Sequence, residues 1–357
     1  MDTKKGTLDM GARQVAENCL KVQPGETVVI ITDEKQMEVG KAIQLAAATA
    51  GGEVIFFSME NFGTRPDEPS EETLAMAFPD EIRNAMESAQ VSVYCASGKK
   101  GELESFRRPM IGVVMEKKIR HGHMPGISKE VMCEAMCADY TQVQALGAKV
   151  YAIANDAVSA HLTTPGGTDL TVKFHPDWKW LVDNGEILGG ELANLPGGED
   201  FTCAENGNGV IVVDGFIGDH FDQSVVDNPI TIKVKDGRIT SVKCPENLEL
   251  EAELLSYFLT DENSNRLSEF AIGTNLAVAI GKNIGELMDR PLLQMEKSPT
   301  VHVAFGDGFK DETGCTWESK THLDCIVLEP TLVLTYADGS TFTVFEDGNY
   351  NPELLAA

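Results

Sequence analysis

The sequence predicts an α/β N-terminal domain with a mostly parallel sheet, followed by a β-rich α+β domain that carries a metal site. Strand and helix patterns alternate through the first half of the chain, which is typical of a parallel sheet covered by helices. Short β-branched runs separated by turn residues fill the second half. The 357 residues exceed the usual size of one hydrophobic core, so we expect two domains, 1–185 and 186–357.

The N-terminal elements begin with a βαβ pattern. The apolar run 27–32 predicts a buried strand, the alanine-rich run 40–50 a helix that ends at Gly51, and the run 54–58 the next strand. No glycine-rich phosphate motif follows these strands or those after them, so the sequence does not predict nucleotide binding. We expect the pattern to continue with a helix at 80–89, strands at 91–95 and 111–114, a helix at 129–146 and a strand at 149–153.

The C-terminal elements are short strands separated by turns. Asp-Gly pairs at 236 and 338 predict tight hairpins, because this dipeptide readily adopts the left-handed backbone that two-residue turns require. We expect a strand at 209–213, hairpins at 230–240 and 332–344, and a helix at 247–259.

Composition excludes several classes of partner. The formal charge of −27, from 56 acidic and 29 basic residues, would repel nucleic acid and anionic membranes, so we expect neither as a partner. No apolar run approaches the length of a membrane span, and the N-terminal segment lacks a signal-peptide core, so we expect a cytoplasmic protein. The eight cysteines form no CxxC pair, which favours reduced thiols over a disulfide framework.

Candidate metal ligands concentrate in the last third of the chain. Glu269, His302, His322 and Asp324 lie there beside glycines or β-forming residues. Imidazole suits zinc, manganese, iron or cobalt, and a carboxylate can bridge two such ions. His322 and Asp324 are two residues apart, so in a strand both point to one face and both can reach one centre. The sequence therefore predicts a metal-dependent enzyme.

Several segments resemble a known family. The segments 190–202, 269–275, 301–307 and 322–324 are similar, in order and spacing, to the metal-binding segments of the thermophilic aminopeptidase T group of leucyl aminopeptidases, and the chain has the length of its shorter members. The pieces 123–127 and 164–170 also resemble that family. Together the matched segments span roughly residues 120–335.

The resemblance implies a function and a ligand set. It implies an aminopeptidase that removes N-terminal residues from small peptides or amides, works as a homodimer, and uses a water activated by two divalent ions such as zinc, cobalt or manganese. Asp324 or Glu269 would bridge the ions. The implied metal ligands are Glu199, Glu269, His302, His322 and Asp324, and the implied catalytic side chains are Glu269, His123 and Thr168.

The chain departs from the family pattern at one position. The well-studied long members carry a tyrosine seven residues after the first ligand histidine, and this chain has Phe309 there, which offers no donor. Slow peptidase chemistry is therefore expected. For His123 a solvated or capping role, and for Thr168 a simple turn, remain alternatives.

Two other functions remain open. The chain also resembles a ring-cleaving dioxygenase that acts on dihydroxypyridine. That enzyme is similar in fold and holds one iron with two histidines and a carboxylate. It lacks the first glutamate and has histidine where Glu269 stands, so Glu199 and Glu269 favour two metals and hydrolysis. A non-catalytic metal-binding protein is the third possibility, although structural sites are usually cysteine-rich.

Overall fold

The computed structural model describes residues 6–70, 73–219, 221, 223–278 and 295–356. The chain forms two compact units, Met1–Tyr140 with Gly185–Gly197, and Thr141–Asn184 with Gly198–Ala357. We expected a single boundary near residue 185. The chain instead passes between the two units three times, after residues 140, 184 and 197. The reason is strand pairing, because strands within 141–184 pair in sheets of the second unit, whereas a strand within 185–197 pairs in the sheet of the first.

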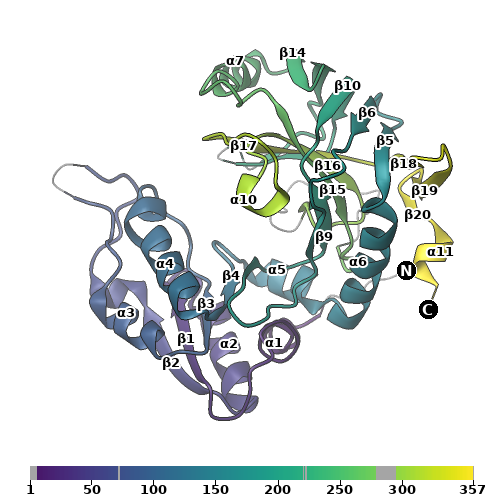
Figure 1. Cartoon of the computed structure of the whole chain (residues 1–357). Coiled ribbons are helices and arrows are strands. Elements are labelled where there is room, and N and C mark those ends of the chain that lie inside the picture. The colour runs from purple at the N-terminus through teal and green to yellow at the C-terminus, as the bar shows by residue number, and fades with distance from the viewer. Residues whose placement is uncertain (1–5, 71–72, 220, 222, 279–294, 357) are drawn as a thin grey trace. The chain divides into compact units, whose positions relative to one another are not determined.

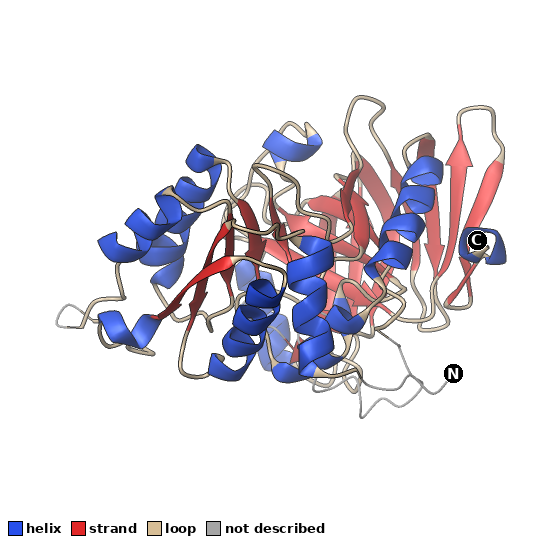
Figure 2. Cartoon of the chain, turned by 90° about the horizontal axis from the view of Figure 1, so that it is seen from below, coloured by secondary structure: helices blue, strands red, loops and turns tan. Residues whose placement is uncertain are grey.

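A parallel sheet forms the centre of the first unit (Figure 1). The described strands follow the order β2-β1-β3-β4-β8, and every neighbouring pair is parallel. Figure 2 shows helices lying against this sheet. The strands are β1 (Thr27–Thr32), β2 (Glu53–Ser58), β3 (Val91–Tyr94), β4 (Arg120–His123) and β8 (Leu192–Asn194), and the helices are α1 (Leu8–Arg13), α2 (Met37–Thr49), α3 (Asp80–Glu87), α4 (Arg108–Lys117) and α5 (Lys129–Cys133).

Two predicted strands are wrong. Residues 111–114 lie within α4, where Met110, Val113 and Val114 are buried at helical spacing. Residues 149–153 lie within α6 (Tyr140–Ala154), and the strand begins only at Ala157. In both segments the apolar residues recur every three or four positions, and this period decides the structure over the β-branched composition. The predicted helix 129–146 is also interrupted between α5 and α6.

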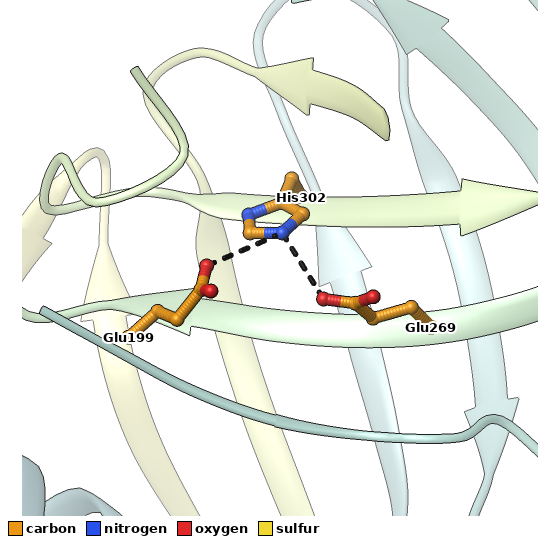
Figure 3. Close-up of side chains that lie close together, drawn as sticks. All are labelled: Glu199, Glu269 and His302. Carbon is orange, nitrogen blue, oxygen red and sulfur yellow. Dashed lines mark ion pairs between the residues drawn. The ribbon is translucent and has the colours of Figure 1, made fainter. Parts of the chain in front are cut away.

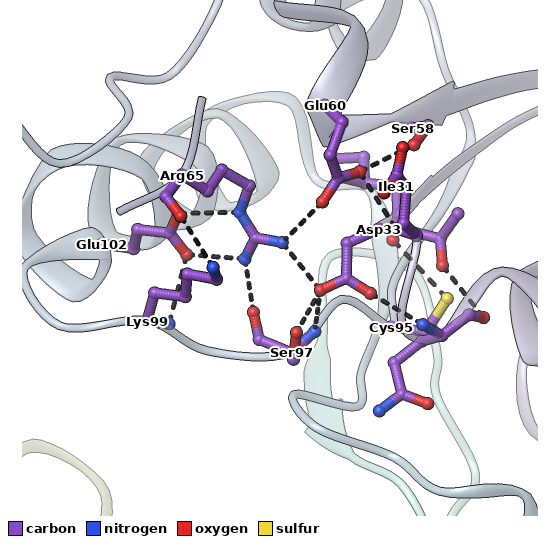
Figure 4. A network of polar contacts seen from close by, with 12 residues as sticks. Ile31, Asp33, Ser58, Glu60, Arg65, Cys95, Ser97, Lys99 and Glu102 are labelled. Carbon is purple, nitrogen blue, oxygen red and sulfur yellow. Dashed lines mark hydrogen bonds and ion pairs between the residues drawn. The ribbon is translucent and has the colours of Figure 1, made fainter. Parts of the chain in front are cut away.

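A buried ion-pair network lies where β1 and β3 end (Figure 4). Arg65, with a side chain 2% exposed, contacts Asp33 at 2.7 Å and Glu102 at 2.7 Å. Asp33 follows β1 and also accepts from the backbone N–H of Ser97, which follows β3. The strand order reverses between β1 and β3, a position at which doubly wound sheets commonly bind ligands. In this chain the buried ion pairs of Arg65 with Asp33 and Glu102 lie at that position.

The second unit is β-rich and antiparallel. One sheet has the order β14-β13-β10-β6-β5-β18-β19-β20, and the other has the order β12-β11-β17-β16-β15-β9-β7. The strands of the first sheet are β5 (Ala157–Thr163), β6 (Asp169–Lys173), β10 (Asn206–Val213), β13 (Ile230–Lys235), β14 (Arg238–Lys243), β18 (Thr331–Tyr336), β19 (Thr341–Glu346) and β20 (Asn349–Tyr350). Those of the second are β7 (Leu181–Asp183), β9 (Glu199–Thr202), β11 (Phe216–Ile217), β12 (Gln223–Ser224), β15 (Leu267–Gly273), β16 (Val301–Gly306) and β17 (His322–Val327).

The two sheets share one hydrophobic core, which includes Phe270, Val303 and Cys325 from one sheet and Leu170 and Leu334 from the other. The expected mixture of a parallel sheet and a β-rich part is therefore confirmed. Both predicted hairpins form, β13 with β14 and β18 with β19. The remaining described α-helices are α7 (Leu248–Tyr257), α10 (Lys310–Thr313) and α11 (Pro352–Leu355). Within the described ranges, no helix has the length and apolar character needed to cross a membrane.

Candidate metal centre

Carboxylate and imidazole side chains gather on one face of the seven-stranded sheet. Strand alternation sends alternate residues to the opposite face, into the hydrophobic core. The register then aligns the polar residues across four strands. The gathered residues are Glu199 on β9, Glu269 on β15, His302 on β16, and His322 and Asp324 on β17.

Each of these five residues pairs on one side with an alanine or a glycine, while on the other side His302 pairs with Ile326 and Glu199 with Asp183. Glu269 and Asp324 both pair with Ala304, and His302 pairs with Ala271. Glu199 pairs with Gly273, and His322 with Gly306. Directly opposite residues have close Cβ atoms, so small partners leave room for the larger polar side chains to converge. The expected strand geometry of the His322-Leu-Asp324 segment is confirmed by β17.

The two oxygens of Glu269 face different histidines. Oε1 lies 3.3 Å from Nε2 of His302, and Oε2 lies 3.2 Å from Nε2 of His322. Figure 3 shows the His302 ring above Glu269 and Glu199. Glu199 Oε2 lies 3.6 Å from the same His302 nitrogen, and Asp324 Oδ1 lies 3.2 Å from Nε2 of His322. Glu269 therefore stands between two clusters of ligand atoms.

These distances define two overlapping groups that could each hold a metal ion. One consists of Glu199, Glu269 and His302, and the other of Glu269, His322 and Asp324. Within each group the ligand atoms lie within 4.8 Å of one another. A carboxylate that belongs to both groups has the position of a bridging ligand. The structure thus brings together all five metal ligands predicted from the sequence.

Hydrogen bonds orient His322 for coordination. Its Nδ1 lies 3.0 Å from the backbone carbonyl oxygen of Asp307, so Nδ1 carries the proton and donates it. Nε2 then faces the carboxylates and can bind a metal ion once it loses its proton, as in many metal sites where a carbonyl fixes the ligand histidine. The backbone N–H of His322 donates to the Tyr257 hydroxyl at 3.0 Å, and that hydroxyl donates to Asp219. Sequence reasoning did not predict Tyr257.

Burial and neighbouring charges shift the pKa values of the side chains in the site. Burial opposes the charge of His302, but hydrogen bonding to Glu269 and nearby carboxylates raise its pKa to about 9. Burial acts on Glu269 as well, yet the two histidines lower its pKa to about 2. Burial raises the pKa of Glu199 to about 8, and Lys297 opposes that shift. In the metal-free chain, protons on imidazole thus supply the positive charge that the carboxylates require.

The donor set fits divalent ions. Glu199 Oε2 is buried and has no hydrogen-bond partner among the described residues, and the same holds for Nδ1 of His302. An unpaired buried carboxylate oxygen costs free energy unless a cation contacts it. Three carboxylates and two imidazoles match the ligands of zinc, cobalt or manganese.

Lys297 is a further charged residue of the site that sequence reasoning missed. Its side chain is 1% exposed, and its Nζ lies 2.5 Å from Oε1 of Glu199 and 3.0 Å from Oδ2 of Asp183. Glu296 contacts the same ammonium at 3.2 Å. Burial alone would favour neutral lysine, but the surrounding carboxylates raise the pKa of Lys297 well above its ordinary value.

The comparisons identify the family. The sequence profile of the thermophilic metalloprotease (M29) family matches residues 133–350, more than half of the chain and all five candidate ligands. The chain belongs to the thermophilic metalloprotease (M29) family. The resemblance to the aminopeptidase T group is thereby confirmed, and this family of metallopeptidases implies the use of divalent metal.

Two solved structures share the fold of this M29 chain. AmpT from Thermus thermophilus is 19% identical, with a TM-score of 0.69 over 96% of this chain and 98% of that one. 2,5-Dihydroxypyridine dioxygenase from Pseudomonas putida KT2440 is 16% identical, with a TM-score of 0.70 over 96% of both chains. At these identities the likeness establishes the fold alone. No curated protein sequence matches the chain.

Phe309, where the motif resemblance predicts a tyrosine, lies beside the candidate metal ligand His322. Its ring centroid is 4.7 Å from that of His322, and its ring meets Phe201 edge-on at 5.8 Å. The backbone of Phe309 has φ of 55°, in the left-handed region that is uncommon for bulky residues. Such backbone strain is often found at functional sites.

His123 lies in the first unit within a chain of hydrogen bonds. Arg107 lies 2.8 Å from its Nε2, and because a guanidinium only donates, Nδ1 of His123 carries the proton. That nitrogen is 3.3 Å from Nε2 of His121, whose Nδ1 is 2.7 Å from the Ser92 hydroxyl. Burial, with the nearby His121 and Arg107, lowers the pKa of His123 well below its ordinary value. Both nitrogens of the buried His123 are engaged by side chains, so neither a solvated nor a capping role is seen, and the catalytic role of His123 remains a prediction.

Thr168 forms hydrogen bonds with backbone groups. Its hydroxyl donates to the carbonyl of Val212 at 3.2 Å and accepts from the Val212 N–H at 2.9 Å. Its own carbonyl accepts from the N–H of Thr164 at 3.1 Å, which closes a turn. The turn role therefore accounts for Thr168, and its catalytic role remains a prediction.

Proposed function

We propose that this chain is a metallo-aminopeptidase that removes N-terminal residues from small peptides with the help of two divalent ions. The observation that supports the proposal best is the position of Glu269, whose two carboxylate oxygens face two different histidines. A mononuclear site needs no such carboxylate between its ligands. A two-metal hydrolase does.

Each side chain then has a defined task. Glu199 and His302 would hold one ion, His322 and Asp324 would hold the other, and Glu269 belongs to both groups. We assign Glu269 the bridging role, because both of its oxygens are directed at ligands and its low pKa makes it a poor proton acceptor. When bound, two divalent ions lower the pKa of a shared water and polarise the carbonyl that it attacks.

The proposal extends to the metal and to the working form of the protein. Zinc, cobalt or manganese suits a donor set of imidazoles and carboxylates. A small peptide or amide substrate, a homodimer and a cytoplasmic location rest on the motif resemblance and the composition. Sedimentation of the purified protein would test the dimer.

The iron dioxygenase is the second candidate, since a dioxygenase shares the fold. Glu269 argues against it, because oxygen-activating iron is usually held by two histidines and one carboxylate with open positions. The additional carboxylate of Glu199, buried beside His302, gives this site more negative charge than one iron requires.

A paired substrate assay tests the proposal. The protein reconstituted with Zn²⁺, Co²⁺ or Mn²⁺ is expected to cleave leucine amide and to leave N-acetyl-leucine amide intact, since an aminopeptidase requires the free amine. The same protein with Fe²⁺ and 2,5-dihydroxypyridine serves as the comparison. Oxygen consumption there, without amide cleavage in any metal form, would contradict the hydrolase.

A further inference from the structure

Lys297 places a permanent positive charge inside one half of the centre. The side chain is 1% exposed, so solvent does not screen its ammonium. It contacts Glu199 at 2.5 Å and Asp183 at 3.0 Å, on two neighbouring strands of the seven-stranded sheet. Glu296, the preceding residue, supplies a third carboxylate at 3.2 Å.

Among the residues that the structure describes, the other half of the centre contains no lysine or arginine paired with its ligands. In the described portions of the chain, the ion pairs of Glu269 and Asp324 are with His302 and His322, and no lysine or arginine reaches them. Imidazole can lose its proton and become a ligand, whereas an ammonium has no lone pair to offer. The two metal positions therefore differ in that one of them has a ligand, Glu199, which is already paired with a permanent cation.

Glu199 divides its two oxygens between Lys297 and His302. Oε1 accepts from the ammonium, and Oε2 lies 3.6 Å from Nε2 of His302. A metal ion in this position could bind only Oε2 of Glu199, because Oε1 is bonded to the ammonium of Lys297, which has the same sign of charge as the ion. Repulsion between like charges at such separations is strong where water is excluded.

We propose that Lys297 is a resident cation that makes the two metal positions unequal, so that the Glu269–His322–Asp324 position fills first and the Glu199–Glu269–His302 position fills second and more weakly. This inference rests on the two-metal centre of the proposed function. Lys297 is then a positioning residue that acts through Glu199, and the weaker ion is the exchangeable one.

Stepwise Co²⁺ titration of the metal-free, full-length chain tests the inference. Calorimetry measures the two affinities, and visible absorption of bound Co²⁺ reports each filling step. The wild type is expected to bind in two steps whose Kd values differ by roughly tenfold or more. Lys297→Met should tighten the second step by roughly tenfold or more and leave the first nearly unchanged, because only the second position loses a like charge.

Two control variants separate charge from shape. Lys297→Arg keeps the charge and is expected to retain unequal steps. Lys310→Met removes a lysine that is 48% exposed and paired with Glu318, and should leave both steps as in the wild type. A tightened second step is diagnostic, because a damaged or misfolded site would bind metal more weakly.

The opposite results overturn the inference. A second step that weakens or stays unchanged in Lys297→Met would show that Lys297 does not compete with metal. Two equal steps in the wild type would overturn it as well, whether or not Lys297→Met folds.

Failure of the proposed function looks different. Unequal binding of two ions without cleavage of any aminoacyl amide contradicts the aminopeptidase and leaves the role of Lys297 standing. Equal binding of two ions by a chain that cleaves aminoacyl amides contradicts the role of Lys297 and leaves the aminopeptidase standing.

Discussion

Oε2 of Glu269 lies 3.2 Å from Nε2 of His322. The other oxygen faces His302, so loss of this one carboxylate should disturb both metal positions. We expect Glu269→Gln to lose both ions, whereas Glu199→Gln should lose only the ion beside His302. Elemental analysis of the dialysed variants measures this difference. Retention of one tightly held ion in Glu269→Gln would show that this carboxylate does not bridge.

His322 and Asp324 should be essential for turnover and dispensable for folding. Both point from β17 to the ligand face, so His322→Ala and Asp324→Asn remove a ligand and leave the hydrophobic core intact. We expect turnover to fall below detection, metal content to drop, and the circular dichroism spectrum to be retained. His161 and Asp169 form an exposed pair at 2.9 Å in the same unit, and His161→Ala is the matched control with unchanged activity. Near-normal activity of either ligand variant without metal would show that the site is wrongly assigned.

Phe309 should limit the rate. If a tyrosine hydroxyl normally stabilises the oxyanion, its absence costs about 2.7–4 kcal/mol, or roughly a hundredfold to a thousandfold in rate. Because Phe309 lies 4.7 Å from the ring of His322, Phe309→Tyr would bring a hydroxyl close to the centre. We expect kcat to rise more than KM changes, since the new contact forms mainly in the transition state. Brisk wild-type cleavage that slows in Phe309→Tyr would instead assign this position to the substrate pocket.

Metal binding should release protons at neutral pH. The pKa of His302 is raised to about 9 in the metal-free chain, so its imidazole is protonated at pH 7 and must deprotonate to coordinate. Apparent affinity should therefore increase as the pH rises from 6 to 9. Calorimetry in two buffers of different ionisation enthalpy measures the released protons. Affinity that is independent of pH over this range would mean that His302 is already neutral or is not a ligand.

Arg65 should stabilise the first unit. Its removal leaves Asp33 and Glu102, both buried, without their cation, and breaking one partner of a buried pair typically costs about 3–5 kcal/mol. We expect Arg65→Met to lower the free energy of unfolding by about that amount, as measured by urea denaturation. Arg108→Met breaks an exposed pair with Glu104 and should leave stability unchanged. Equal stability of the two variants would show that the network is not structural.

The sequence predicted the parts of the site that follow from local spacing. His322 and Asp324 share a face because two residues in a strand always do, and β17 confirms it. Glu199 became a candidate only through the motif resemblance. Lys297 was not predicted, because its contact with Glu199 joins positions 98 residues apart and depends on how the strands pair.

The fold shows the same limit. The strand at 27–32 and the two Asp-Gly hairpins were predicted correctly, because the local sequence of each segment favours one structure. The run 111–114 was not, because four residues taken alone fit a strand as well as a helix, and their helical period shows only when Met110 is included. The chain crosses between the units three times for a related reason, since strand partners are chosen over long sequence separations.

Anomalous diffraction from a crystal of the Co²⁺-saturated protein tests the two-metal centre most directly. We predict two peaks, one on each side of the Glu269 carboxylate, with Glu199 and His302 at one peak and His322 and Asp324 at the other. A single peak held by the two histidines and Asp324, with Glu199 still bound to Lys297, would contradict the two-metal aminopeptidase.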